Sequence, residues 1–186
     1  MEKRRQLGLP EDAYVVLTVG ELTKRKNQKV ILDALAQQND PTVHYVLCGK
    51  GDQRETLEQQ AQTLGIADRV HFLGYRLDLP EIYRTADCFA FSSIHEGLPF
   101  ALMEAMASGL PIACSRIRGN VDLIDDELGG ILCDVHSSKQ FLTALTKLRT
   151  ADREAMVAYN REKLVTFDVN NTKKIIFSVF EEVIKL

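Results

Sequence analysis

The sequence centres on Ser93-Ile-His-Glu-Gly-Leu-Pro-Phe-Ala-Leu-Met-Glu-Ala-Met-Ala-Ser-Gly-Leu-Pro111, which lies between two short apolar runs. Pro99 favours a helix start, because a proline lacks the N–H that the first helical turn leaves unpaired. Gly109 favours a helix end, because it accepts a left-handed backbone. The residues between them predict a helix over 99–108 that is apolar on nearly every face and therefore buried.

Glu104 lies in the middle of this apolar helix. A buried carboxylate is costly unless a hydrogen bond compensates it, and no basic residue lies three or four positions away to pair with it. We expect its partner to come from elsewhere in the fold or from a ligand.

The composition fits one α/β domain. The 186 residues are 45% hydrophobic and 26% charged with a net charge of −3, which argues against nucleic acid or an acidic membrane as the main partner. No apolar run reaches the roughly 18 residues of a membrane span, and the N-terminus lacks the apolar segment of a signal peptide. Four scattered cysteines, with no CxxC pair or histidine cluster, indicate reduced core residues, no metal site and a cytoplasmic location.

Short apolar runs alternate with helical patterns along the chain. The apolar runs predict strands over residues 14–19, 43–48, 70–73, 88–91, 112–114 and 130–133. The other patterns predict helices over residues 28–38, 53–64, 79–86, 99–108, 121–124, 138–148, 153–164 and 172–185. Such alternation predicts right-handed βαβ units. We therefore expect one Rossmann-like domain over residues 1–186, with an open parallel sheet of about six strands and helices on both faces.

Glycines and charged residues follow the predicted strands. In an open parallel sheet, ligands bind beyond the carboxyl ends of the strands. The segments at these ends are 20–27, 49–52, 74, 92–97 and 115–120. Any one of these glycines could serve an ordinary βα turn. Five such ends in succession favour a large cleft lined by backbone N–H groups, cations and carboxylates.

Lys24, Arg25 and Lys26 stand just before a predicted helix, where the helix dipole and free N–H groups already favour an anion. They predict a phosphate or diphosphate site, with a solvated surface loop as the alternative. Gly49-Lys-Gly51 forms a tight turn, but the full GxGxxG pattern and an acidic residue at the end of strand 43–48 are missing. A nicotinamide-dependent dehydrogenase is therefore disfavoured.

Glu96 and Gly97 precede the predicted buried helix. The amides of Gly97 and Leu98 are expected to face the cleft and to bind an anion or a hydroxyl. The alternative for Glu96 is a carboxylate that only caps the helix.

Three polar residues are weaker candidates. His95 is more often a packing or surface residue than a catalyst. Asn120 and Asp122 are predicted to cap the short helix around them rather than to line the cleft.

The chain resembles the C-terminal, donor-binding half of a retaining glycosyltransferase of family 4, the group 1 glycosyltransferases of GT-B fold. The resemblance runs from about Leu7 to Asp134, and its most specific part is Glu-x7-Glu, here Glu96 and Glu104. Supporting matches are Val19-Gly20…Lys26-Asn27, Cys48-Gly-Lys-Gly51, Val70-His-Phe-Leu-Gly74 and Gly119-Asn…Asp122-Leu-Ile. The run 118–124 is similar to members that build bacterial surface polysaccharides.

The resemblance implies a role for each matched position. Glu104 would bind the ribose hydroxyls of a nucleotide-diphosphate sugar, and Glu96 would contact the transferred sugar. Lys26 would hold the diphosphate and stabilise the leaving group in place of a metal, so that Glu96 and Lys26 are the catalytic pair and no cofactor is needed. The segment 72–74 would meet the nucleobase, mainly through its backbone. The further donor-binding residues are Gly20, Lys24, Gly49, Gly51, Phe72, Leu73, Gly74, Gly97, Leu98 and Pro99.

Two departures from the family pattern carry expectations. Many members have arginine directly after the glycine of the first strand, where this chain has Glu21, so Lys24 is expected to supply the second cation. Active members also have an N-terminal acceptor domain, which this chain is expected to lack, so transfer by the chain alone is not expected. Apolar surface left by that missing half would favour self-association. Membrane contact of the complete enzyme would reside mostly in the missing half.

The leading interpretation is donor binding for retaining transfer of a sugar in polysaccharide biosynthesis. The alternatives are a non-catalytic nucleotide-sugar-binding module, or a subunit completed by a separate N-terminal chain. A GT-B epimerase, which would convert a donor without any acceptor, and a purely structural Rossmann domain also remain. Glu96, Glu104 and Lys26 favour the enzyme, because a scaffold has no physical need to bury Glu104.

Overall fold

The fold is built on one parallel sheet. The structure is a computed structural model that describes residues 2–171, 173 and 177. The sheet has six strands, all parallel, in the order β3-β2-β1-β4-β5-β6. The strands are β1 (Tyr14–Val19), β2 (Val43–Cys48), β3 (Val70–Gly74), β4 (Cys88–Phe91), β5 (Ile112–Ser115) and β6 (Ile131–Cys133). The predicted Rossmann-like sheet is confirmed, and its strand order reverses between β1 and β4, where such sheets bind ligands.

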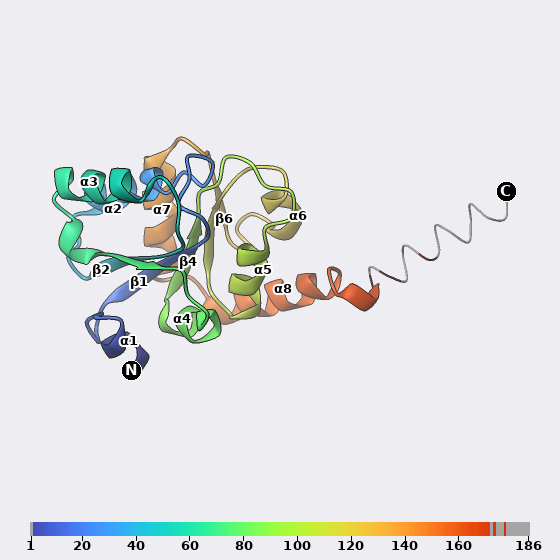
Figure 1. Cartoon of the computed structure of the whole chain (residues 1–186). Coiled ribbons are helices and arrows are strands. Elements are labelled where there is room, and N and C mark those ends of the chain that lie inside the picture. The colour runs from blue at the N-terminus through green and yellow to red at the C-terminus, as the bar shows by residue number, and fades with distance from the viewer. Residues whose placement is uncertain (1, 172, 174–176, 178–186) are drawn as a thin grey trace.

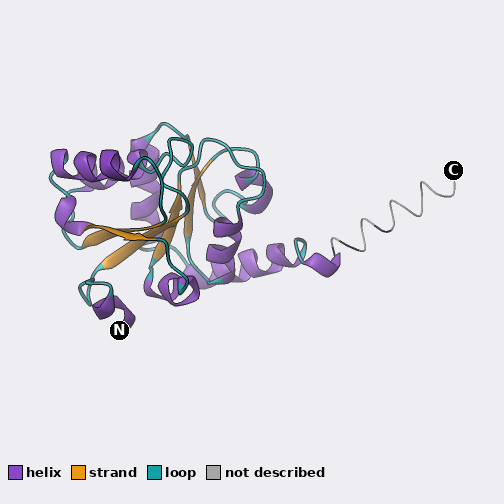
Figure 2. Ribbon diagram, viewed as in Figure 1, coloured by secondary structure: helices purple, strands orange, loops and turns teal. Residues whose placement is uncertain are grey.

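Helices cover both faces of the sheet (Figures 1 and 2). One apolar cluster joins the sheet to α2 (Lys29–Gln38), α3 (Arg54–Thr63) and α7 (Ser138–Leu148). A second cluster joins the other face to α4 (Leu79–Thr85), α5 (Phe100–Ala107), α6 (Asn120–Leu123) and α8 (Arg153–Val165). Two short elements complete the described part, α1 (Glu2–Gln6) and the 3-10 turn η1 (Ala67–Arg69). The chain is thus a three-layer α/β domain.

Most strands are buried on both sides, as parallel strands covered by helices must be, whereas the edge strand β3 is half-buried. All residues of β2, β4, β5 and β6 are buried. The four cysteines are free and buried in these strands, which confirms the prediction that they are reduced core residues. Among the described helices, none has the length and apolarity that a bilayer crossing would require.

The structure differs from the sequence-based expectations in two respects. The short elements α1 and η1 were not predicted, because five and three residues are too few to show an apolar period. Helix α5 buries one face only, through Leu102, Ala105 and Met106, while Phe100 is 72% exposed and Glu104 is exposed. The prediction of a helix buried on nearly every face is therefore wrong. An evenly apolar sequence does not reveal which face the fold covers. The predicted helix 172–185 lies outside the described residues, apart from 173 and 177.

Candidate functional site

The candidate site lies at the carboxyl edge of the sheet, where the loops after β1, β2, β3 and β4 meet (Figure 1). Two glycines let the first two of these loops touch. A Cβ added to Gly49 would lie 1.8 Å from the carbonyl oxygen of Gly20, and one added to Gly51 would lie 2.1 Å from that of Leu22. The Leu22 amide donates to the Lys50 carbonyl at 2.9 Å. Gly49 and Gly51 thus have a structural role, which is to let two backbones approach closely.

A charged cluster spans the reversal point of the sheet. Glu96, in the loop after β4, accepts hydrogen bonds at Oε1 from Lys26 Nζ at 2.7 Å and from Arg25 Nη1 at 3.0 Å. Both cations come from the loop after β1. The Lys26 ammonium also lies 4.9 Å from the centre of the Phe91 ring. Two cations share one carboxylate, so the cluster carries a net positive charge and can attract an anion.

Glu96 is kept ionised by its neighbours. Its burial, with 9% of the residue exposed, raises the pKa of the carboxyl. The hydrogen bond from Lys26 and the charges of Lys26 and Arg25 outweigh burial, so the pKa of Glu96 lies below its usual value. The carboxylate therefore remains an acceptor for cations and hydroxyls at neutral pH.

The backbone behind Lys26 is anchored to the residue that follows strand β4. Ser92 Oγ donates to the carbonyls of Lys26 and Asn27, both at 3.0 Å. Asn27 Nδ2 donates in return to the carbonyls of Ser92 at 3.3 Å and Val135 at 2.7 Å. A Cβ added to Gly20 would lie 3.5 Å from Lys26 Cε, so this glycine borders the lysine stem. These contacts fix the ammonium group beside Glu96.

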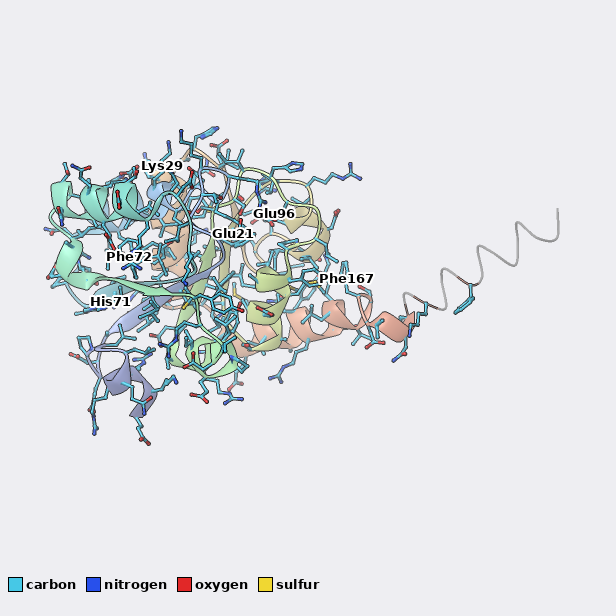
Figure 3. The ribbon with its side chains drawn as sticks, viewed as in Figure 1. Glu21, Lys29, His71, Phe72, Glu96 and Phe167 are labelled. Atoms are coloured by element: carbon cyan, nitrogen blue, oxygen red, sulfur yellow. The ribbon has the colours of Figure 1, made fainter. Side chains whose placement is uncertain are left out.

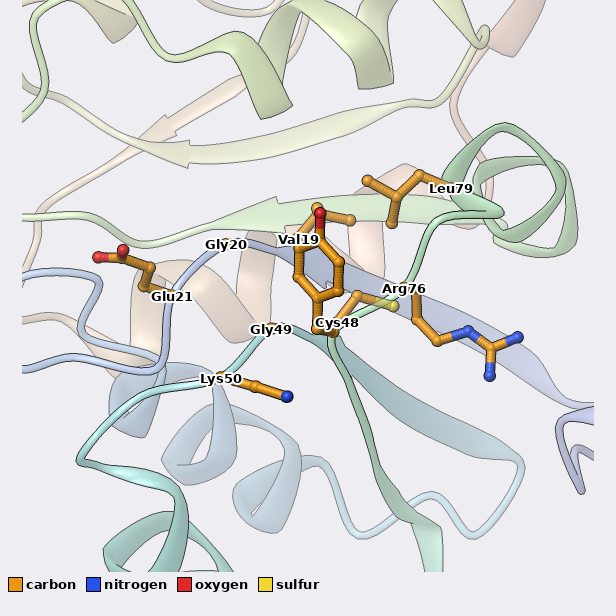
Figure 4. A pocket seen from close by; sticks show the side chains of 9 residues that line it. Val19, Gly20, Glu21, Cys48, Gly49, Lys50, Arg76 and Leu79 are labelled. Atoms are coloured by element: carbon orange, nitrogen blue, oxygen red, sulfur yellow. The ribbon is translucent and has the colours of Figure 1, made fainter.

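A pocket of about 310 Å³ opens next to the cluster, and Gly20 belongs to its wall (Figure 4). We call it the β1–β3 pocket. It is lined by Val19, Gly20, Glu21, Cys48, Gly49, Lys50, Tyr75, Arg76 and Leu79. Burial raises the pKa of the Cys48 thiol to about 12, so this side of the pocket is neutral. The lining is mostly apolar, with the two cations Lys50 and Arg76 and one carboxylate, Glu21. Its size and its excess of positive charge suit part of a small anionic ligand.

Arg76 is held in this pocket by a fork of hydrogen bonds. Its Nε and Nη2 donate to the two carboxylate oxygens of Asp78 at 2.8 and 2.6 Å. Lys3, from α1, pairs with the same carboxylate at 2.5 Å. Hydrogen bonds from Arg76 and then Lys3 hold the pKa of Asp78 far below its usual value. The sequence reasoning missed Arg76 and Tyr75, although their position directly after Gly74 at a strand end was a usable signal.

The predicted nucleobase segment lies beside this pocket rather than in its wall. The Gly74 carbonyl accepts a hydrogen bond from the Gly49 amide at 2.8 Å. Leu73 packs into the apolar cluster of one sheet face, whereas Phe72 packs into the other, 5.8 Å under the Arg54 guanidinium. Figure 3 shows Phe72 on β3, apart from Glu96. The side chains that reach the pocket come one and two residues later in the chain.

Glu104 is exposed, and its partner is a tyrosine. The Tyr83 hydroxyl donates to Glu104 Oε2 at 2.9 Å. Burial, followed by the charge of Glu104, raises the pKa of Tyr83 well above its usual value, so the phenol stays a donor. The expectation of a buried Glu104 is wrong. One of its oxygens is engaged, and its exposure leaves it accessible to a ligand.

The loop before α5 is supported from the neighbouring β5 loop. A Cβ on Gly119 would lie 2.6 Å from the Gly97 carbonyl oxygen. Pro99 is the N-cap residue of α5, and Leu98 is 46% exposed. Gly97 and Leu98 are therefore exposed next to Glu96, whereas Pro99 is buried at the start of α5.

Neither Asn120 nor Asp122 caps a helix, since the N-cap residue of α6 is Gly119 and no side chain caps that end. Asn120 is fully buried and donates through Nδ2 to the Ser115 carbonyl at 2.9 Å. The capping prediction is wrong for Asn120, which instead ties α6 to the end of β5.

The second cation beside Glu96 is Arg25. Lys24, which was expected there, is exposed and lines a different pocket. Arg25 Nη1 also donates to the His95 carbonyl at 2.9 Å, and the His95 side chain is exposed. Among the described residues, no group of three or more His, Cys, Asp or Glu side chains could hold a metal ion.

This sheet order and its cationic carboxyl edge define a nucleotide-binding domain of Rossmann type. Comparison with known proteins agrees. The family described as Glycosyl transferases group 1 matches residues 1–163. A D-inositol 3-phosphate glycosyltransferase of Salinispora tropica is 35% identical over 97% of this chain and 41% of its own length. The UDP-Gal:alpha-D-GlcNAc-diphosphoundecaprenol alpha-1,3-galactosyltransferase of Escherichia coli is 32% identical over 78% of this chain and 39% of its own length.

Solved structures show the same relation. The crystal structure of HepE from Anabaena in complex with UDP-glucose superposes with a TM-score of 0.86 and 28% identity, over 97% of this chain and 52% of that one. The chain belongs to the group 1 glycosyltransferase family and corresponds to its C-terminal domain, one half of a GT-B fold. It spans about two fifths of the length of the first two relatives named above.

Proposed function

We propose that this chain binds a uridine diphosphate sugar and, together with an acceptor-binding domain, transfers the sugar with retention at the anomeric carbon. The observation that carries the proposal is the pairing of Lys26 and Arg25 with Glu96 beside the β1–β3 pocket. The complex of HepE with UDP-glucose and the UDP-Gal donor named for the Escherichia coli relative support a uridine nucleotide.

Each residue of the cluster has a task in this proposal. Lys26 and Arg25 neutralise the diphosphate and stabilise the negative charge that develops on the leaving UDP, without a bound metal. Glu96 orients Lys26 and accepts a hydroxyl of the transferred sugar. Glu104 receives the ribose hydroxyls, and the base contacts Arg76 in the wall of the β1–β3 pocket. Water must be excluded for transfer rather than hydrolysis, which is the task of the acceptor domain.

Ligand-dependent stability of the chain tests donor binding. A nucleotide at about 100 times its dissociation constant should raise the unfolding free energy by about 2.7 kcal/mol. We expect this rise for UDP, a smaller one for GDP and ADP, and no loss of the UDP effect when EDTA is added. Glu104→Gln should remove most of the rise, whereas Glu162→Gln, an exposed carboxylate on α8, should leave it unchanged.

Equal stabilisation by all three nucleotides would contradict a uridine-selective site. Stabilisation that requires a divalent metal would contradict the role given to the two cations. Transfer is then measured with the acceptor-binding domain restored. UDP binding without any transfer in that complete protein would favour the non-catalytic nucleotide-sugar-binding module.

A further inference from the structure

A second pocket is lined by the β1–α2 loop and the starts of α2 and α3. Its volume is about 460 Å³. It is formed by residues of the segments 23–29 and 53–57, together with Ile94 and His136, and we call it the α2–α3 pocket. It shares no lining residue with the β1–β3 pocket within the described part of the chain. The β1–α2 loop contributes to both walls, with Gly20 and Glu21 in the β1–β3 pocket and Thr23 and Lys24 in the α2–α3 pocket.

The α2–α3 pocket is basic. Lys24, Lys29 and His136 line it, and no Asp or Glu is found among the described residues of its wall. The first turns of α2 and α3 both reach it, at Gln28 and Gln53, and neither helix has a side-chain cap there. The positive ends of the two helix dipoles add to the positive potential. The pocket therefore favours an anion.

Three buried polar atoms around this pocket lack a hydrogen-bond partner in the described structure: Thr23 Oγ1, Asn27 Oδ1 and Gln28 Oε1. Asn27 and Gln28 are only 3% and 1% exposed. Their amide nitrogens donate to backbone carbonyls, which identifies the oxygens as the unsatisfied atoms. A buried acceptor without a donor is costly. A ligand that completes this wall must bring hydroxyl groups as well as negative charge.

We propose that the α2–α3 pocket binds a small phosphorylated sugar or polyol. The phosphate meets Lys24, Lys29 and the two helix N-termini, and the hydroxyls donate to the amide oxygens of Asn27 and Gln28. The Ile94 amide donates to the Arg25 carbonyl at 2.8 Å, so the wall of the pocket is continuous with the loop that bears the cations of the charged cluster. A ligand bound in the α2–α3 pocket would therefore order the β1–α2 loop, which carries Lys26 and Arg25.

Calorimetric titration of the chain with glucose 6-phosphate, inorganic phosphate and glucose tests the proposal, each with and without saturating UDP. We expect one molecule of glucose 6-phosphate to bind per chain, more tightly than inorganic phosphate, in the presence of UDP as in its absence. Glucose should not bind measurably. Lys29→Gln should weaken glucose 6-phosphate binding about tenfold, the size of one charge-assisted hydrogen bond. Lys139→Gln, which removes the same charge from an exposed position at another pocket, should have no effect.

Each contrary result overturns a definite part of the inference. No binding of either phosphate compound at millimolar concentration means that the pocket is not an anion site. Equal affinity for inorganic phosphate and glucose 6-phosphate means that the amide oxygens meet no ligand hydroxyl. Loss of binding upon addition of UDP means that the pocket belongs to the donor site. Because UDP binding is measured separately, failure here is distinguishable from failure of the proposed function.

Discussion

Replacing Gly51 with alanine tests the close approach of the loops after β1 and β2. The added Cβ would lie 2.1 Å from O, 2.6 Å from C and 2.7 Å from N of Leu22. All three are backbone atoms, so no flexible side chain can move aside. Gly51 is not among the glycines with positive φ. The cost is therefore steric rather than conformational.

The loss of unfolding free energy can be worked out from the hydrogen bonds that the added methyl group would break. Separating the loops breaks the Leu22 N–Lys50 O and Gln53 N–Leu22 O hydrogen bonds, both 2.9 Å long. Two such bonds contribute about 2 kcal/mol net, and overpacking adds about 1–3 kcal/mol. We expect Gly51→Ala to lower the free energy of unfolding by about 3–5 kcal/mol. For a chain of this size, Tm should fall by about 10 °C.

Urea unfolding followed by far-UV circular dichroism measures this loss. The matched control is Gly97→Ala, since a Cβ at Gly97 would meet no atom within 4 Å. Its effect should stay below about 0.5 kcal/mol. A loss below about 1 kcal/mol for Gly51→Ala, or equal losses for the two variants, would refute the steric argument.

Three further predictions concern other parts of the molecule. His44 Nδ1 and His71 Nε2 lie 2.9 Å apart, and burial lowers the pKa of both rings. Near this pH the unfolded chain therefore binds more protons than the folded one, and the free energy of unfolding should fall as the pH drops through about 6.5. The double change His44→Asn, His71→Asn should flatten this part of a plot of urea midpoint against pH. Phe100 is 72% exposed, so sedimentation velocity should show concentration-dependent self-association that Phe100→Ser weakens, whereas a monomer at every concentration would contradict the expectation. Asn120→Ala removes two buried hydrogen bonds to Ser115, so urea unfolding should show a loss of about 2 kcal/mol, and an unchanged midpoint would show that this tie is not stabilising.

The sequence predicted the sheet because its strands are short apolar runs bounded by glycines and charges. The sequence also predicted that Lys26 and Glu96 lie at the same edge of the sheet, although they are 70 positions apart in the chain. Both residues follow strands that were predicted to be parallel. Strands that alternate with helices run parallel, so their carboxyl ends lie at one edge of the sheet. The ion pair itself could not be predicted without the order of the strands, because β1 and β4 are neighbours in the folded sheet but not along the chain.

The side chains that the sequence misplaced are those whose direction depends on loop backbone or on the covered face of a helix. Arg25 rather than Lys24 reaches Glu96, and one position in a loop decides this. Glu104 is exposed because α5 turns only one face to the sheet. Arg76 enters the β1–β3 pocket because Asp78 and Lys3 hold it there, and the contribution of Lys3 comes from a helix that has no apolar period.

The Lys26–Glu96 ion pair has a mechanical consequence, because it bridges the least extensive strand pairing of the central sheet. All of β1 is in register with β2, whereas within the described strands only Val16 and Leu17 are in register with β4. The two halves of the sheet therefore meet along a short seam. The ion pair links these halves at the carboxyl ends of β1 and β4, beside the hydrogen bonds between Ser92 and Asn27. A phosphate held by Lys26 and Arg25 beside Glu96 would add a further link across this seam. Ligand binding would then be recorded as slower hydrogen exchange along β4, where the two halves of the sheet meet.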